Sequence, residues 1–120
     1  MGPAIGRPWP AESEPYIHML VVAAIFEIHI EYAQSLKDKR MVVRSLRDKL
    51  RGRFEISASE VAFQDLHQRA RLGVAFISHD HAGADAMLDR IHNFIESNTD
   101  AVLAGWMSEK LDFDEMATLT

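Results

Sequence analysis

The 120-residue sequence contains no cysteine, which excludes disulfides and thiolate metal sites. It also lacks a long hydrophobic segment, because the longest apolar run, Met19–Phe26, is too short to cross a bilayer as a helix. The N-terminus has no basic-then-apolar pattern of the kind that marks a secretory signal. These absences predict a cytoplasmic protein without a membrane partner, and the length predicts one domain with a single core.

Proline is missing from most of the chain, since all four prolines lie within the first fifteen residues. This break in composition predicts an irregular, proline-rich leader at residues 1–17. We expect residues 18–108 to form the folded domain and residues 109–120 to form an acidic C-terminal tail.

The spacing of apolar residues predicts the order strand, helix, strand, strand, helix, strand. Apolar residues alternate from Leu20 to Ile30 in the first strand, and Ser35 is a good N-cap for a helix that Gly52 should end. The remaining segments are strands near 54–63, 70–78 and 101–108, and a second helix capped by Ser78 or Asp80.

This order is typical of an α+β, ferredoxin-like βαββαβ fold. Right-handed crossovers place both helices on one face of a four-stranded antiparallel sheet, and the expected strand order is 4-1-3-2. We expect the core between sheet and helices to contain Phe26, Leu46, Ile91 and Trp106.

Basic residues are scarce outside one segment, residues 37–53. That segment holds eight of the thirteen Lys and Arg residues and only two acids, so its net charge is +6 while the rest of the chain carries −11. At 100° per residue, five of these residues fall within an arc of about 80° on a helix. They form a basic stripe, which consists of Lys37, Arg40, Arg44, Arg47 and Arg51.

Like charges at this spacing destabilise an isolated helix by roughly 0.2–0.5 kcal/mol per pair, so we expect something to offset them. Acids on the second helix, which include Asp85, Asp89 and Glu96, are one candidate, within the monomer or between protomers. Phosphate is the other, because each guanidinium group donates a planar fork of hydrogen bonds. The sequence leaves both alternatives open, together with simple exposure of the stripe to solvent.

A second polar cluster should form where the first and third strands pair. It comprises Glu27, His29, Arg69 and Arg71, which should share the open face of the sheet. Cross-strand ion pairing explains these residues adequately. Catalysis by a Glu–His pair is the alternative, although no nucleophile accompanies it.

Motifs for catalysis, metal binding and phosphate loops are absent from the sequence. His79-Asp80-His81 is explained as a polar cap at a helix start. We therefore predict a non-enzymatic protein with no catalytic residues, no metal site and no cofactor.

The open face of the sheet should be apolar and free of large aromatic residues at its centre. Its central positions are Val21, Ala23, Ile25, Gly73 and Ala75. RNA-recognition domains of this fold stack bases on aromatic residues at such positions, so that mode of binding is not expected. An apolar patch of this kind is better covered by another sheet, a tail or the leader. Homodimerisation is a natural use of such a face, and we predict a homodimer through it.

The assembled residues resemble the YlxP-like family of unknown function. The resemblance covers about residues 19–108 and rests on several short runs: Glu27-Ile28-His29-Ile30, Ser35-Leu36-Lys37-Asp38-Lys39-Arg40, Ser59-Glu60-Val61 and Asp65-Leu66-His67-Gln68-Arg69-Ala70. Two positions depart from the family pattern, because Glu31-Tyr32 replaces a frequent Pro-Gly and His67 replaces a common Trp.

The resemblance implies a small bacterial cytoplasmic protein with a ferredoxin-like fold and no established reaction. Genes of the family often lie near translation-initiation and ribosome-maturation genes, which implies association with RNA. We therefore predict a binding protein that contacts structured RNA or the ribosome through its basic helix, with no role for DNA. The alternative is a self-associating interaction or regulatory module whose basic helix pairs with an acidic protein surface.

Overall fold

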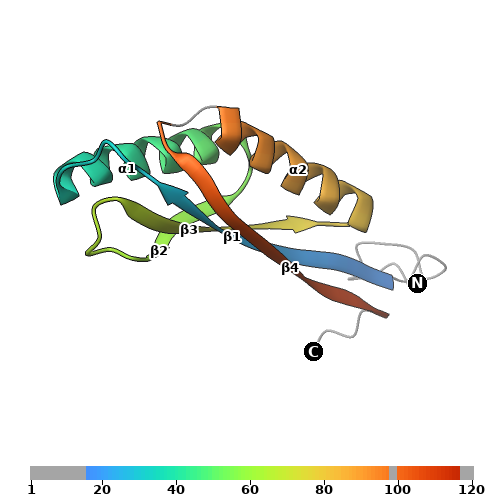
Figure 1. Ribbon diagram of the computed structural model, residues 1–120. Coiled ribbons are helices and arrows are strands. Elements are labelled where there is room, and N and C mark those ends of the chain that lie inside the picture. Colours follow the sequence, from blue (N-terminus) through green and yellow to red (C-terminus); the bar gives the residue numbers. More distant parts are fainter. Residues whose placement is uncertain (1–15, 98–99, 117–120) are drawn as a thin grey trace, which may run out of the picture.

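The computed structural model describes residues 16–97 and 100–116 (Figure 1). The elements are, in chain order, β1 (Tyr16–His29), α1 (Leu36–Arg53), β2 (Ser57–Ala62), β3 (Arg69–Ser78), α2 (His81–Ser97) and β4 (Val102–Met116). Residues 1–15 of the expected leader and residues 117–120 of the expected tail lie outside the described residues. The leader was predicted to extend to residue 17, but residues 16 and 17 belong to β1.

The four strands form one antiparallel sheet in the order β2-β3-β1-β4, and both helices lie on the same face of it (Figure 1). This is the predicted 4-1-3-2 order counted from the other edge, so the ferredoxin-like fold is confirmed. Within the described residues, no helix has the length and hydrophobicity needed to cross a bilayer.

The core lies between the sheet and the helices and is built from alternate strand residues. The largest contributions come from β1 and β3, with Leu20, Val22, Phe26, Ile28, Leu72, Val74 and Phe76. Leu46 of α1 and Ile91 of α2 are buried against them, as predicted. Trp106 stacks on Phe26 with ring centroids 6.0 Å apart, but it is only partly buried because β4 is an edge strand.

Helix α1 begins as predicted and ends one residue later than predicted. The Ser35 hydroxyl accepts a hydrogen bond from the Asp38 amide at 3.1 Å, which confirms Ser35 as the N-cap. The expectation that Gly52 ends the helix is wrong, because the helix continues to Arg53. Phe54 ends it: its amide donates to the Leu50 carbonyl at 3.0 Å, and its side chain enters the core.

Residues between β3 and α2 form the predicted helix cap. The Asp80 carboxylate accepts a hydrogen bond from the Gly83 amide at 2.6 Å, and the Ser78 hydroxyl donates to the Asp80 carbonyl at 2.8 Å. Asp80 is therefore the capping residue, and Ser78 fixes the backbone that precedes it.

Strand β4 is much longer than predicted and includes residues 109–116, which were expected to form an acidic tail. It pairs with β1 over its whole length, as far as the pair Tyr16↔Met116. A register shift in this pairing lets Leu103 and Trp106 face the same helix-covered side of the sheet. From Trp106 onward, even-numbered residues continue on that side and odd-numbered residues lie on the open face.

Candidate functional site

The basic stripe lies on the surface of α1, beside the residues that the helix buries. The buried positions are Lys39, Val43, Leu46 and Leu50. Four stripe residues are exposed and Arg47 is half-buried. The structure thus places the stripe where a ligand can reach it.

Contacts at the end of α1 show which way the stripe faces. Arg51, the last residue of the stripe, donates a hydrogen bond of 2.6 Å to the Ala58 carbonyl of β2. Arg53, which lies outside the stripe, stacks instead over Phe94 of α2, 5.2 Å from the ring centroid. The stripe therefore faces the β2 edge of the sheet, on the flank of α1 away from α2.

Two acids of α2, Asp85 and Glu96, have partners other than the stripe. Asp85 pairs with Lys110 of β4, and Glu96 lies 3.3 Å from His92 on its own helix. Among the residues that the structure describes, Arg47 pairs only with its neighbour Asp48, at 3.1 Å. Within residues 16–97 and 100–116, no ion pair joins α1 to α2, and Lys37, Arg40 and Arg44 have no carboxylate partner. Acids in the described part of the chain therefore leave most of the stripe uncompensated.

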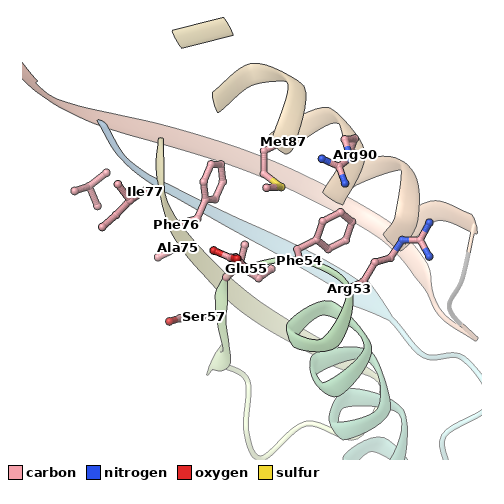
Figure 2. Close-up of a pocket in the computed structure, with 11 residues that line it drawn as sticks. Arg53, Phe54, Glu55, Ser57, Ala75, Phe76, Ile77, Met87 and Arg90 are labelled. Atoms are coloured by element: carbon pink, nitrogen blue, oxygen red, sulfur yellow. The ribbon is translucent and has the colours of Figure 1, made fainter. Parts of the chain in front are cut away.

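A cavity of about 810 Å³ opens where the end of α1 approaches α2 and β3 (Figure 2). Phe54, Phe76 and Met87 give it an apolar lining, and Arg53 and Arg90 lie at its rim (Figure 2). The Arg90 guanidinium stacks over Phe54 at 5.4 Å, just as Arg53 stacks over Phe94. Neither arginine has a carboxylate partner in the described part of the chain. Sequence reasoning missed this pair because the two residues lie on different helices.

The polar cluster on the open face assembles as predicted around one carboxylate. The Glu27 oxygens lie 2.9 Å from Arg69, 3.0 Å from Arg71 and 2.7 Å from His29. The strand register produces this arrangement, because Glu27 pairs with Arg71 and His29 with Arg69. The hydrogen bond from His29, then that from Arg71, lowers the pKa of Glu27 to about 2, with Arg69 adding to the effect against the cost of burial.

The same two arginines also stack on an aromatic ring that sequence reasoning did not connect with them. Their guanidinium groups lie 4.3 Å and 4.8 Å from the centroid of Phe63, in the connection between β2 and β3. Arg69 and Arg71 already contact Glu27 and Phe63. This cluster therefore connects β1, β3 and the loop between β2 and β3. It has less free charge to offer an anion than the stripe on α1.

Six large apolar side chains of the described residues are exposed along the open face of the sheet. They are Ile25, Val61, Ile77, Met107, Leu111 and Phe113, with exposed fractions between 39% and 69%. Register places them on one surface, since Ile25 pairs with Met107 and both Ile77 and Leu111 pair with Val21. Isolated exposed apolar residues are ordinary, but a contiguous group of this size marks an interaction surface.

Fold and surface together define a ferredoxin-like α+β domain with a basic flank on its first helix and an apolar open sheet face. The chain belongs to the DUF503 family, described as a protein of unknown function, which it matches over residues 21–106. It is also similar to the uncharacterized protein YlxP of Bacillus subtilis (strain 168), with 35% identity over 65 residues. That alignment covers 54% of this chain and 71% of the Bacillus protein. The family resemblance seen in the sequence is thereby confirmed.

Proposed function

We propose that this protein is a non-enzymatic binding protein whose basic stripe contacts the phosphates of structured RNA, with ribosomal RNA as the first candidate. The observation that carries the proposal is the exposure of Lys37, Arg40 and Arg44 without carboxylate partners in the described residues. An uncompensated row of cations on a helix favours an anionic partner. Guanidinium groups suit phosphate because they donate paired hydrogen bonds in one plane.

Arg53 at the end of α1 and Arg90 of α2 form a second group of positive charges, separate from the stripe. Their faces rest on Phe94 and Phe54, which leaves the N–H groups at the guanidinium edges available to an anion. The stripe and this arginine pair lie on different sides of α1. A ligand that contacts both must therefore be larger than a single phosphate. A folded RNA, with phosphates in several directions, meets this condition.

The overall charge of −5 favours docking in one orientation over indiscriminate binding. Salt at physiological strength screens charges beyond about 8 Å, so an RNA phosphate close to the stripe feels mainly the local positive charge. The acidic remainder of the surface repels the same RNA elsewhere. We therefore expect binding to particular RNA structures rather than to any nucleic acid.

Salt-dependent binding of ribosomal RNA fragments tests the proposal. If Arg44 contacts one phosphate, Arg44→Gln should weaken binding and flatten the log–log salt dependence by roughly 0.7–0.9. Lys49→Gln is the matched control, because it removes one charge from an exposed position of the same helix outside the stripe. Equal effects of the two changes, or no RNA binding by the unaltered protein, would refute the role of the stripe.

The apolar open face supports a second candidate function, a self-associating interaction module. In it the open face binds a second copy, and the basic stripe pairs with an acidic protein surface. Four strands about 4.8 Å apart and about ten residues long cover roughly 650 Å² of sheet. That is the scale of a stable interface, which buries about 800 Å² on each partner. A pull-down from cell extract with and without ribonuclease separates the two functions, since only captured RNA is lost on digestion.

A further inference from the structure

Three side chains from distant parts of the sequence meet where α2 begins. They are His18 of β1, His81 of α2 and Asp112 of β4. The Nε2 atom of His81 lies 2.9 Å from one Asp112 oxygen, and that of His18 lies 3.4 Å from the other. One ligand atom from each residue can be chosen so that all three lie within 4.8 Å of one another.

We propose that these three residues bind a divalent transition metal of the zinc type. Two imidazole nitrogens and a carboxylate oxygen are a donor set that suits such ions, whereas calcium and magnesium prefer oxygen alone. Bonds of about 2.0–2.1 Å to a tetrahedral ion place neighbouring ligand atoms about 3.3 Å apart. The two histidine–carboxylate separations, which involve different Asp112 oxygens, lie near this value. The three ligand atoms lie within 4.8 Å of one another, so they must move closer together to reach a metal.

The three ligands come from three different elements, β1, α2 and β4. The Asp112 carboxylate contacts both imidazole rings, through a hydrogen bond with His81 and an ion-pair distance to His18. These contacts keep the three side chains together in the absence of a metal. The nearest cation on the same strand, Lys110, is neutralised by Asp85 one helical turn after His81. The side chains are between 36% and 53% exposed, which gives an ion access from solvent and leaves room for water as a fourth ligand.

The proposed site is a property of this chain rather than of the family region. His18 and Asp112 lie outside residues 21–106, in the paired ends of β1 and β4. A metal here would join those strand ends to the first residue of α2. Because a ligand that binds only the folded state stabilises it, binding should also raise the thermal midpoint.

Calorimetric titration of the untagged full-length chain with Zn²⁺ near neutral pH tests the site. We expect saturable uptake of one ion per chain and a higher thermal midpoint. His18→Ala, His81→Ala and Asp112→Asn should each weaken binding by at least about tenfold, which is the lower range even for loss of an outer-shell partner. Each variant should also abolish the rise in the midpoint.

His79→Ala is the matched control, because His79 is 92% exposed and pairs with Asp80 outside the group. It should bind Zn²⁺ as the unaltered protein does. If it weakened binding as much as His81→Ala, the metal would lie on the exposed His79 and His81 instead, and the proposal would be overturned. Absence of saturable uptake would overturn it as well. Circular dichroism of each variant shows whether the fold is retained, and His81→Gln replaces any alanine variant that unfolds.

Discussion

The buried Lys39 ammonium group of α1 lies 2.8 Å from the Glu60 carboxylate of β2. The same ammonium donates a hydrogen bond to the carbonyl of Phe63, a non-glycine residue with a φ of 65°. Such left-handed backbone is unfavourable for a bulky side chain and persists only where its surroundings hold it. One cation thus joins the helix to the edge strand and to the residue on which Arg69 and Arg71 stack.

Replacing Lys39 should therefore destabilise the protein more than replacing any stripe residue. Lys39→Met keeps most of the side-chain volume but leaves the partly buried Glu60 carboxylate without its counter-charge and the Phe63 carbonyl without its hydrogen-bond donor. We expect the free energy of unfolding in urea to fall by about 1–3 kcal/mol, the usual cost of unsatisfied buried polar groups. Lys37→Met, at an exposed position of the same helix, should stay within about 0.5 kcal/mol of the unaltered protein. Similar values for the two variants would contradict the role of Lys39.

The low pKa of Glu27 should make the stability of the protein depend on pH in acid. The pKa is about 2 in the folded state and near 4.3 in an unfolded chain, so the ionised carboxylate stabilises the fold. This contribution is complete above about pH 4.5 and is lost as the pH falls towards 2. After allowance for the half-exposed arginine partners, it amounts to roughly 1–2 kcal/mol.

Glu27→Gln provides the measurement. At neutral pH its free energy of unfolding should be lower than that of the unaltered protein, and the difference should shrink as the pH is lowered from 4.5 towards 2. A difference in the free energy of unfolding that stays constant over this range would show that the contribution of Glu27 to stability does not come from its charge. Arg71→Gln should show the same narrowing to a smaller extent, because Arg69 and His29 still contact the carboxylate.

Phe26 and Trp106 form a stacked pair, but they differ in burial, and their replacement should differ accordingly. Phe26 is 1% exposed at the centre of the core, so Phe26→Ala should cost about 3–5 kcal/mol. Trp106→Ala should cost less, about 2–3 kcal/mol, because the ring covers the core from an edge strand and keeps contact with solvent. Chemical denaturation of both variants gives the comparison, and a larger loss for Trp106 would contradict it.

Hydrophobic periodicity was sufficient to predict the sheet, because alternate burial in β1 and β3 follows from core packing alone. It also predicted the cluster around Glu27, since antiparallel register brings the end of β1 to the start of β3. Hydrophobic periodicity did not predict the burial of Lys39, because a charged residue there occupies a core position. Lys39 stands on the same arc as Val43, Leu46 and Leu50, a spacing that could have revealed its burial, but its charge grouped it with the basic segment.

The end of β4 was missed for a related reason. Its acidic residues suggested a tail, although Met107, Leu111 and Phe113 occupy alternate positions typical of a strand with one apolar face. The group of His18, His81 and Asp112 could not be predicted from sequence motifs, because its members are far apart in the chain. Only the pairing of β1 with β4 and the position of the first turn of α2 bring them together.

The extended β4 strand enlarges the apolar open face and sharpens the prediction that the protein is a homodimer. Ile77 and Met107 are the most exposed large apolar residues of that face, at 69% and 64%, and they lie on the strands that flank β1. Since both side chains are largely solvated in the monomer, replacing them with Glu should change its stability by no more than about 0.5 kcal/mol each. In a dimer formed through this face, the same changes would bury carboxylates without partners.

The double variant Ile77→Glu, Met107→Glu should therefore be a folded monomer at concentrations where the unaltered protein is a dimer. Light scattering and sedimentation velocity over a range of concentrations measure this directly. Met41→Glu is the matched control, because Met41 is also 63% exposed but lies on α1, away from the open face; it should leave the dimer intact. A dimer that survives the double substitution would place the interface elsewhere. An unaltered protein that remains monomeric at every concentration tested would contradict the predicted homodimer.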